Sequence, residues 1–470
     1  MRKFYWYFTA YVRKHGPTVI LSILGGVIFF SILMPFLMKR LTIKKREYIG
    51  IVGEYNLQTL PSEIKHKLSM GLTTVDPEDQ SIEPLLSERW ITENDGHTYR
   101  FTLKKGLKWQ DGLELTPDTI NYNLKDVEVI STPNDLVFKL PAAFAPFPAV
   151  VTEPIFRQTL ESYLIFFKKP NIIGLGPYKI SSYTQNNNRL QELVLDGPED
   201  RLIYRFYLTE QDAIIGFKKG EVDTINDIRQ IEDLEKWGER NITLERKIKY
   251  DQYLAIFFNH NDPLITRNLK QALYYALDKP KGEERAVSPI NPFSWAYLEG
   301  GKDYAKDWER GTERILSSLP NQPLEISLTT TSIFNQEANQ IKKEWEEFGQ
   351  HAYEKCQNSS DVEDKSLCEN LKISVQLKIS NFPDTQNYQA LLLGQEIPID
   401  PDQYFLWHSD QPTNFTNYKN TRIDSLLEKG RQTLEQKERQ TVYQEFQQFL
   451  LEDPPAIFIK FLPSYTITRE

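Results

Sequence analysis

The sequence predicts a mixed α/β protein of several domains that follows one N-terminal membrane-spanning helix. The chain has 470 residues, which is room for about two to four domains of ordinary size. Strand-like apolar runs alternate with segments of helical periodicity along the body of the chain. A long uncharged apolar stretch lies close to the N-terminus. These three observations together give the fold class.

The N-terminal element is an uncharged stretch of twenty residues, Val19 to Met38. As a helix it would be about 30 Å long, the thickness of the hydrocarbon core of a bilayer. No small-residue cleavage site follows it, which favours an uncleaved anchor over its alternatives, a signal peptide or a buried core helix. Basic residues flank the stretch on both sides, so charge alone does not orient it. The aromatic run Phe4 to Phe8 suits a membrane interface.

The body of the chain is acidic. The net charge is −9 over all 470 residues, but residues 1–46 hold nine Lys and Arg and no Asp or Glu. Residues 47–470 therefore carry 47 basic and 65 acidic side chains, a net charge of −18. This balance argues against nucleic acid as a partner, because such binders need basic patches for the phosphates.

Strands and helices are predicted in turn along the body. Strand-like runs lie at Tyr99–Leu103, Leu254–Phe258, Leu324–Leu328 and Ala456–Ile459. Helical periodicity marks residues 268–278, 335–348 and 437–451, and Asp453-Pro454-Pro455 should end the last of these helices. Asp95-Gly96 and Asp111-Gly112 predict hairpin turns. The polar stretches 184–191 and 357–366 predict surface loops.

Motifs of catalysis are not found, and we expect no enzyme, cofactor or metal site. The six histidines form no H-x-x-x-H or H-E-x-x-H pair, and no G-x-S-x-G nucleophile elbow occurs. Gly174-Leu175-Gly176 lacks the third Gly of a dinucleotide loop and the Lys-Ser/Thr of a P-loop. Two cysteines are too few for a disulfide scaffold or a four-cysteine zinc site.

Six sequence blocks resemble one known family. They are Gly71–Thr73 with Pro84–Trp90, Asp95–Gly112, Leu115–Thr119, Gly174–Tyr178, Ala213–Asp223, and Phe257–Asn259 with Leu269–Asp278. In this order and spacing they resemble the family 5 extracellular solute-binding proteins, the oligopeptide- and dipeptide-binding components of ABC importers. Each block alone is a weak match, and most also read as turns, strands or helices of the fold.

The resemblance implies a two-lobed, periplasmic-binding-protein-like fold with a small inserted third region. The first lobe would comprise residues 47–80, 168–252 and 455–470, the inserted region 81–167, and the second lobe 253–454, behind the anchor in 1–46. It also implies a peptide ligand enclosed between the lobes, an ABC permease as partner, and residues 47–470 outside the cytoplasmic membrane. The alternative is an anchored sensor or interaction protein that kept the fold without transport.

Ligand-binding residues follow from the resemblance and each has a structural alternative. Asp402, with Asp400 next, could pair with a peptide's amino group, or both could belong to a solvated turn. Trp407 could face the ligand or lie in the core. Asn259 could bond the ligand backbone or cap its own loop.

Two further candidates complete the predicted ligand set. Tyr418 could form a wall of the pocket. Trp109 and its neighbour Asp111 could face the cleft from the other lobe, although a hairpin role is the simpler interpretation.

The two cysteines, Cys356 and Cys368, are predicted to form a disulfide. They are the only cysteines, they lie twelve residues apart in a polar stretch, and the predicted extracytoplasmic compartment favours oxidation. Two reduced thiols are the alternative.

Overall fold

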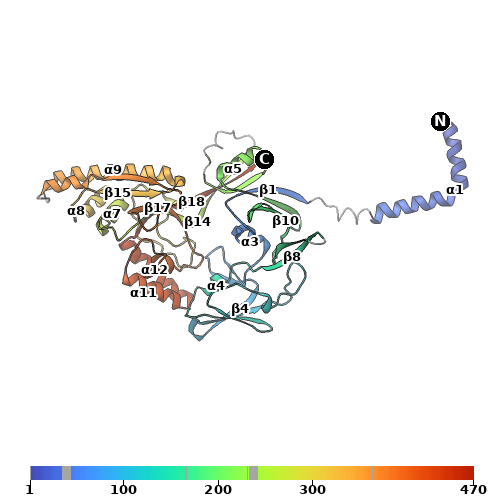
Figure 1. Ribbon diagram of the computed structural model, residues 1–470, viewed down its shortest axis with the longest axis horizontal. Coiled ribbons are helices and arrows are strands. Elements are labelled where there is room, and N and C mark those ends of the chain that lie inside the picture. The colour runs from blue at the N-terminus through green and yellow to red at the C-terminus, as the bar shows by residue number, and fades with distance from the viewer. Residues whose placement is uncertain are drawn as a thin grey trace.

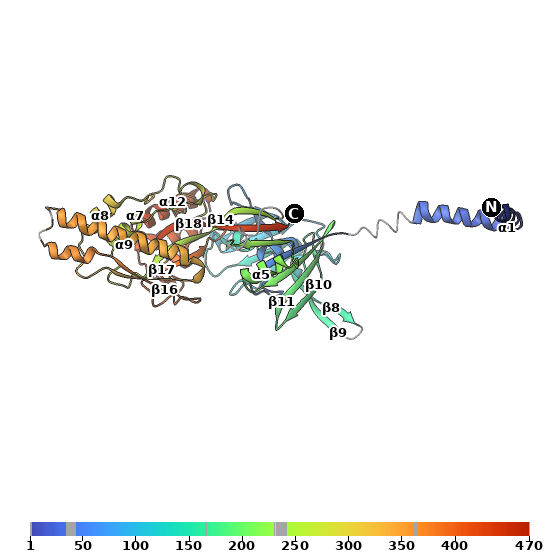
Figure 2. The same cartoon turned by 90° about the horizontal axis from the view of Figure 1, so that it is seen from above.

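The protein consists of an N-terminal helix and a two-lobed α/β body (Figure 1). The computed structural model describes residues 2–33, 44–164, 167–229, 231, 242–360, 362 and 364–469. In both views the helix stands apart from the body, and the two lobes lie side by side (Figures 1 and 2). The predicted fold class is confirmed.

The N-terminal helix is α1, Arg2–Ile28, which continues as a short π-helix, η1, Phe29–Leu33. Within it, Arg13–Ser31 is long and apolar enough to cross a membrane, and none of that window is buried against the body. The predicted span, 19–38, is described only as far as residue 33, and its last five residues lie outside the described part of the chain.

A ten-stranded sheet runs through both lobes in the order β10-β11-β12-β1-β13-β18-β14-β17-β15-β16. Its two central strands are β14, Ile242–Phe258, and β18, Ala456–Arg469. They pair antiparallel from Ile242 with Arg469 to Phe257 with Ala456, so each strand contributes to both lobes. The register is irregular between Lys249 and Tyr253, which face Leu462 and Phe461 respectively.

The first lobe is built on the other strands at one end of this sheet. The parallel neighbours β1 and β12 stand beside the β10–β11 hairpin on one side and β13 on the other. Helices α3 and α5 pack here, and a separate hairpin, β8–β9, extends away from the lobe in Figure 2. The elements are β1 Lys45–Val52, α3 Ser62–Leu68, β8 Arg157–Leu164, β9 Phe167–Ile173, β10 Lys179–Asn186, β11 Arg189–Asp196, β12 Asp200–Tyr207, α5 Glu210–Lys218 and β13 Thr224–Ile228.

One predicted loop of this lobe is wrong. Residues 184–191 belong mostly to β10 and β11, which pair as far as Asn186 with Arg189. Asn187 and Asn188 form the two-residue turn with φ of 49° and 60°. Asn tolerates the left-handed conformation that such hairpin turns require, so a polar sequence here forms a hairpin tip instead of a loop.

The inserted region is a four-stranded antiparallel sheet in the order β4-β5-β7-β6 with a short helix, α4. The predicted turns are confirmed: Gly96 and Gly112 have φ of 89° and 87°, and the first connects β4 to β5. The elements are β2 Thr73–Val75, β3 Ile82–Pro84, β4 Ser87–Glu93, β5 Thr98–Leu103, β6 Glu128–Ser131, β7 Asp135–Lys139 and α4 Phe147–Val150, with 3-10 turns η2 Asn94–Gly96 and η3 Pro117–Thr119.

The second lobe places helices on both faces of its part of the sheet. Leu254, Ile256 and Phe258 of β14 pack into one core with α7, α8 and α9. Their alternate neighbours pack into the other core with α11 and α12. The elements are α7 Arg267–Ala276, η4 Gly282–Glu284, α8 Trp308–Leu316, β15 Glu325–Thr330, η5 Ser332–Phe334, α9 Asn335–Asn358, η6 Lys365–Leu371, β16 Ser374–Ile379, β17 Ala390–Glu396, α10 Tyr404–Trp407, α11 Thr421–Gln432 and α12 Gln436–Glu452.

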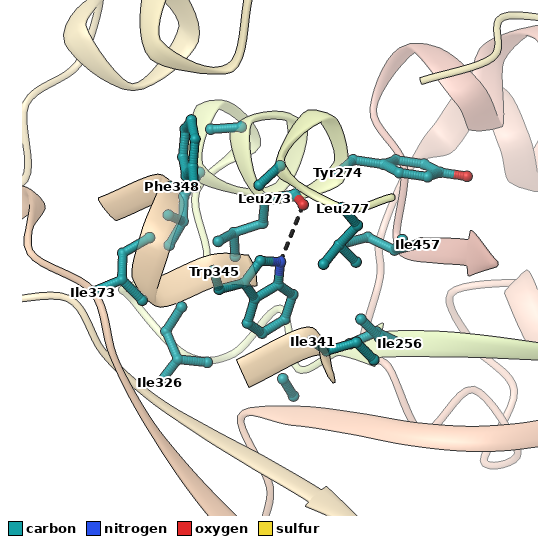
Figure 3. Close-up of a cluster of buried hydrophobic side chains, with 14 of the residues drawn as sticks. Ile256, Leu273, Tyr274, Leu277, Ile326, Ile341, Trp345, Phe348, Ile373 and Ile457 are labelled. Atoms are coloured by element: carbon teal, nitrogen blue, oxygen red, sulfur yellow. Dashed lines mark hydrogen bonds between the residues drawn. The ribbon is translucent and has the colours of Figure 1, made fainter. Parts of the chain in front are cut away.

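Burial on both faces explains why β14 has an uninterrupted apolar run and not an alternating one. At the centre of the first core, the indole of Trp345 from α9 lies among aliphatic side chains, and its Nε1 donates to the carbonyl of Leu273 at 3.1 Å (Figure 3). Near the end of α9, Cys356 and Cys368 are joined by a disulfide, with Cα atoms 5.7 Å apart.

Candidate functional site

The residues predicted to contact the ligand begin with two carboxylates in front of α10. Asp400 accepts two hydrogen bonds from Arg439 of α12, at 2.7 and 3.0 Å. Asp402 accepts from Nε of Arg431 of α11 at 2.8 Å. The Asp400 and Asp402 side chains are only 10% and 8% exposed. The structure therefore pairs both carboxylates with arginines of their own lobe.

The charge state of Asp400 depends on its arginine. Burial raises the pKa of Asp400, and the charge and hydrogen bonds of Arg439 oppose that shift. Burial likewise acts against the charge on Arg439, but Asp400 and Tyr443 outweigh it, so that the pKa of Arg439 is raised. The close bidentate geometry supports an ionised pair.

Asn259 and Tyr418 hold a loop of the second lobe in place. The Asn259 amide donates to the carbonyl of Tyr388 at 2.9 Å, and its oxygen accepts from the amide of Asn417 at 3.0 Å. Tyr418 is buried, and its hydroxyl accepts from Asn420 at 3.0 Å. Both side chains thus bond within the protein.

The two predicted tryptophans lie in cores. Trp407 is fully buried and stacks on Phe257, with ring centroids 6.2 Å apart. Trp109 is buried in the inserted region, where its Nε1 donates to the hydroxyl of Thr119 at 3.3 Å. Its neighbour Asp111 pairs with Arg157 and accepts from the backbone of Leu113. The two tryptophans thus lie where their structural alternatives put them, whereas Asp400 and Asp402 are buried and paired and do not form the solvated turn that was their alternative. A role in ligand binding stays a prediction for all six residues.

The inserted region and the second lobe meet along a seam, visible in Figure 1 where α11 lies beside α4 and β4. The backbone N–H of Ala145 donates to the carbonyl of Arg431 at 2.7 Å, and that of Trp295 donates to the carbonyl of Asp79 at 2.8 Å. The Arg431 guanidinium also lies over the Phe144 ring, 5.2 Å from its centroid.

Two cavities open along this seam. The larger, of about 620 Å³, is mainly apolar, with Phe144 and Phe147 on one side and Tyr404, Phe405 and Arg431 on the other. We call it the seam cavity.

The smaller cavity, of about 140 Å³, lies between Trp90 and Tyr99 of the inserted region and Trp295, Asp400 and Arg439 of the second lobe. Of the six predicted ligand residues, Asp400 is the one found here.

A third cavity, of about 400 Å³, lies at the junction of the lobes near the hinge strands. It is lined by Arg229 of the first lobe, by Glu337 of the second lobe and by Lys460 of β18, the strand that both lobes share. Lys460 and Glu337 form an ion pair at 3.0 Å across part of this wall. Within the described ranges, no cluster of three or more His, Cys, Asp or Glu could hold a metal ion.

Sequence reasoning missed the arginines that bind the two carboxylates. Arg431 and Arg439 lie about thirty and forty positions after their partners, on two helices whose relative placement no local pattern reveals. The aromatic residues of the seam, Phe144 and Phe405, also carry no signal, because exposed and buried aromatics look alike in a single sequence.

The comparisons with known proteins agree with this architecture. The family model for bacterial extracellular solute-binding proteins, family 5 (middle), matches residues 81–398. The oligopeptide-binding protein AppA of Bacillus subtilis is 23% identical, over 88% of this chain and 85% of its own. The dipeptide-binding protein of Escherichia coli is 21% identical, over 80% of each chain.

Solved structures share the fold. A nickel ABC transporter protein of Bacillus halodurans superposes with a TM-score of 0.68 at 14% identity, covering 90% of this chain and 95% of its own. The AppA structure of Bacillus subtilis in complex with a nonapeptide gives 0.62 at 18% identity, covering 91% and 95%. Because the family model matches well over half of the sequence, this chain belongs to the bacterial extracellular solute-binding proteins of family 5.

Proposed function

We propose that this chain is a membrane-anchored binding protein that captures a peptide between its lobes and delivers it to an ABC permease. The apolar helix holds it in the cytoplasmic membrane, and residues 47–470 stand outside. As the resemblance implies, we assign 47–80, 168–252 and 455–470 to the first lobe, 81–167 to the inserted region and 253–454 to the second lobe. At the boundaries, β2 pairs with β3 of the inserted region and β8 pairs with β9 of the first lobe. The names of AppA and the dipeptide-binding protein, which span most of this chain, support a peptide as ligand.

The observation that carries the proposal is the seam cavity, which lies between the inserted region and the second lobe, two parts of the fold that belong to separate sheets. Strands β14 and β18 continue from lobe to lobe, while the seam itself has few backbone hydrogen bonds. A ligand held there would touch the inserted region, which is attached to the first lobe, and the second lobe, and its binding would favour the closed arrangement.

The chemistry of the seam cavity suits part of a peptide. Its apolar wall would accept a side chain, while Lys125, Arg431 and Glu428 of the lining supply two positive charges and one negative charge. A peptide's amino group could reach Asp402 only by replacing Arg431, because that carboxylate is already paired. Recognition of a free amine would therefore be an exchange of one cation for another.

Binding of a peptide mixture to the ectodomain, residues 44–470, tests the proposal. Native mass spectrometry would identify bound peptides, and titration calorimetry would measure their affinity. Phe405→Ala removes a half-exposed wall of the seam cavity and should weaken binding about tenfold or more, the effect of losing roughly 1.5 kcal/mol of apolar contact.

Phe382→Ala is the matched control, since Phe382 is 92% exposed and does not line the seam cavity. Equal effects of both substitutions would remove the seam cavity from the proposed site. Small-angle scattering with and without a bound peptide would detect closure, and an unchanged radius of gyration at saturation would argue against hinge motion.

A sensor or interaction protein that kept the fold without transport is the second candidate. One observation favours it: Asp400 and Asp402 are already neutralised by arginines of the second lobe. Cross-linking of the full chain in its native membrane separates the two. Capture of permease subunits supports transport, and capture of other proteins with no permease supports the second candidate.

A further inference from the structure

The N-terminal helix has two halves separated by a bend. His15 has non-helical backbone angles, φ −121° and ψ 25°, and Pro17 follows two residues later. Proline has no N–H to donate to the carbonyl four residues before it, and its ring crowds that turn, so a bend is expected here. Figure 1 shows the chain change direction sharply within α1.

The second half can cross the membrane without the first. From Gly16 to Leu33 the helix has eighteen residues with no charged side chain. That length gives about 27 Å, close to the hydrocarbon thickness of a bilayer. The first half, with its cations, is therefore not needed for the crossing, and placing those cations at the bilayer centre would be costly.

The first half is both basic and aromatic. Residues 2–14 contain four Lys and Arg and no acidic residue. Its described aromatic side chains, from Tyr5 to Phe8 and Tyr11, are all at least 60% exposed. Apart from a ring contact between Tyr11 and His15, none of these rings packs on another ring among the described residues. Such a surface in water is unfavourable, whereas Trp and Tyr are stabilised at a membrane interface.

Three aromatic side chains of this half share one face. Tyr7, Phe8 and Tyr11 are spaced three and four residues apart, which places them on one side of a helix. At about 100° per residue, Arg13 falls on the opposite side together with Trp6, and Lys14 falls beside Tyr7, where its long side chain can extend toward the headgroups. An exposed basic helix with such an aromatic face is suited to lie in the membrane plane.

We propose that residues 2–14 form an in-plane helix that binds anionic phospholipid headgroups on the cytoplasmic surface of the membrane. This inference rests on the proposed function, because the second half of α1 must cross the membrane for the first half to reach that surface. With the body outside, a single crossing puts residues 2–14 on the cytoplasmic side, where the leaflet is anionic and attracts basic segments. The helix would thereby orient the anchor, which the flanking charges alone do not.

Spin labels on the full chain in vesicles test the geometry. The two native cysteines are disulfide-bonded, so one introduced cysteine is labelled alone. Single substitutions Tyr7→Cys, Phe8→Cys, Thr9→Cys, Ala10→Cys and Tyr11→Cys are compared in phosphatidylcholine containing one third phosphatidylglycerol. Labels at 7, 8 and 11 should be accessible to oxygen and shielded from a water-soluble nickel chelate, and labels at 9 and 10 should show the reverse.

A label at Val27→Cys, in the second half of α1, separates this inference from the anchor itself. If Val27 is in lipid but positions 7–11 show uniform accessibility, the in-plane helix is refuted while the anchor stands. If Val27 is also in water, both the anchor and the in-plane helix are refuted.

Two further experiments test whether the helix recognises anionic lipid and on which side of the membrane it lies. In the anionic vesicles, the double variant Arg13→Gln with Lys14→Gln should move a label at position 11 out of the lipid, so that the label becomes accessible to the nickel chelate. In pure phosphatidylcholine the same double variant should leave the accessibility of this label unchanged. An equal loss in both would refute recognition of anionic lipid. In intact protoplasts, Tyr11→Cys should resist a membrane-impermeant thiol reagent that labels Phe382→Cys, and labelling of both would refute the cytoplasmic location.

Discussion

The buried pair of Asp400 and Arg439 allows a sharp test of how the second lobe is stabilised. We consider Arg439→Met, which keeps the approximate volume and removes the charge. The guanidinium makes two bonds to Asp400, one to the carbonyl of Gly430 at 2.9 Å and one to the hydroxyl of Tyr443 at 3.3 Å. Its loss leaves Asp400 as an unpaired carboxylate with a side chain only 10% exposed.

The expected cost is about 3–5 kcal/mol, the usual effect of breaking a buried ion pair from one side. Arg422→Met is the matched control, because the pair of Arg422 with Glu445 at 3.5 Å is half-exposed and should contribute only about 0–1 kcal/mol. Asp400→Leu combined with Arg439→Met should recover much of the loss, since replacing both charges by apolar groups is often neutral or stabilising.

The cost should also depend on pH, with a definite sign. In Arg439→Met the largest causes that lower the pKa of Asp400 are gone, while burial, which raises this pKa most, and the smaller opposing hydrogen bond from the backbone of Asp402 remain. A folded-state pKa above the unfolded value binds more protons in the folded state, so the variant gains stability as pH falls. The deficit against the wild type should be smallest at acidic pH, below the ordinary pKa of about 3.9, and largest above the raised pKa.

Urea unfolding of the ectodomain at several pH values measures this deficit. A cost no larger than that of Arg422→Met, or one independent of pH, would refute the view that Asp400 depends on Arg439 for its charge. The double variant Asp400→Leu with Arg439→Met distinguishes loss of the ion pair from general misfolding. A variant that merely misfolds would not be rescued by a second substitution at the partner.

The remaining predictions concern binding, the disulfide and a buried lysine. Arg431→Gln should free Asp402 and strengthen the binding of free-amine peptides about tenfold or more, because a hydrogen bond to a charged group contributes roughly 1.5–3 kcal/mol to the binding free energy. Calorimetry should show no gain in affinity for N-acetylated peptides. An equal gain for both kinds of peptide would exclude Asp402 as the amine partner. Asp402→Asn should weaken the binding of free-amine peptides and leave the binding of N-acetylated peptides unchanged. Reduction of Cys356–Cys368 should lower the unfolding free energy by roughly 3 kcal/mol on the chain-entropy model, and an unchanged melting temperature in reductant would contradict this. Burial lowers the pKa of Lys279 to about 7. The unfolded state therefore binds more protons than the folded state between about pH 7 and 10, and the unfolding free energy should rise with pH in that range. Lys279→Met should flatten this rise in urea titrations, and an unchanged slope would refute the role of Lys279.

Local elements of the fold follow from the sequence because their causes are local. The turn at Asp95-Gly96 needs a residue that accepts positive φ, and Gly96 has it at 89°. The helix expected at 437–451 is α12, Gln436–Glu452, and it ends just before the predicted Asp-Pro-Pro stop. In contrast, the predicted helix 335–348 is too short, because α9 extends from Asn335 to Asn358. Its later turns are stabilised by packing of Ala352 and Cys356 in the core and not by a strong local pattern.

The site is less predictable because its properties depend on distant partners. A carboxylate in a D-P-D turn has the same sequence whether it is open to solvent or bound to an arginine on another helix. Trp407 likewise could be a platform or a core residue, and only its stack on Phe257 across the lobe distinguishes them. In both cases the role of the residue depends on a partner far away in the sequence. The chemistry of the single residue does not reveal that partner.

The irregularity in the central strands indicates where the two lobes can move. Lys249 and Tyr253 of β14 face the adjacent residues Leu462 and Phe461 of β18, so three residues of β14 lie between partners that are neighbours in β18. An extra length of this kind bends a strand and interrupts its ladder. A second shift follows between Leu254 and Ala255, and beyond these two irregularities the pairing of β14 with β18 is regular, so each end of the two strands stays with its own lobe. Tyr250, inside this bulge, packs edge-on against Phe293 and Phe461, at 4.8 and 5.2 Å between ring centroids. We therefore expect lobe opening, measured by the scattering experiment above, to bend the sheet at residues 250–252 and to leave the ladders on both sides intact.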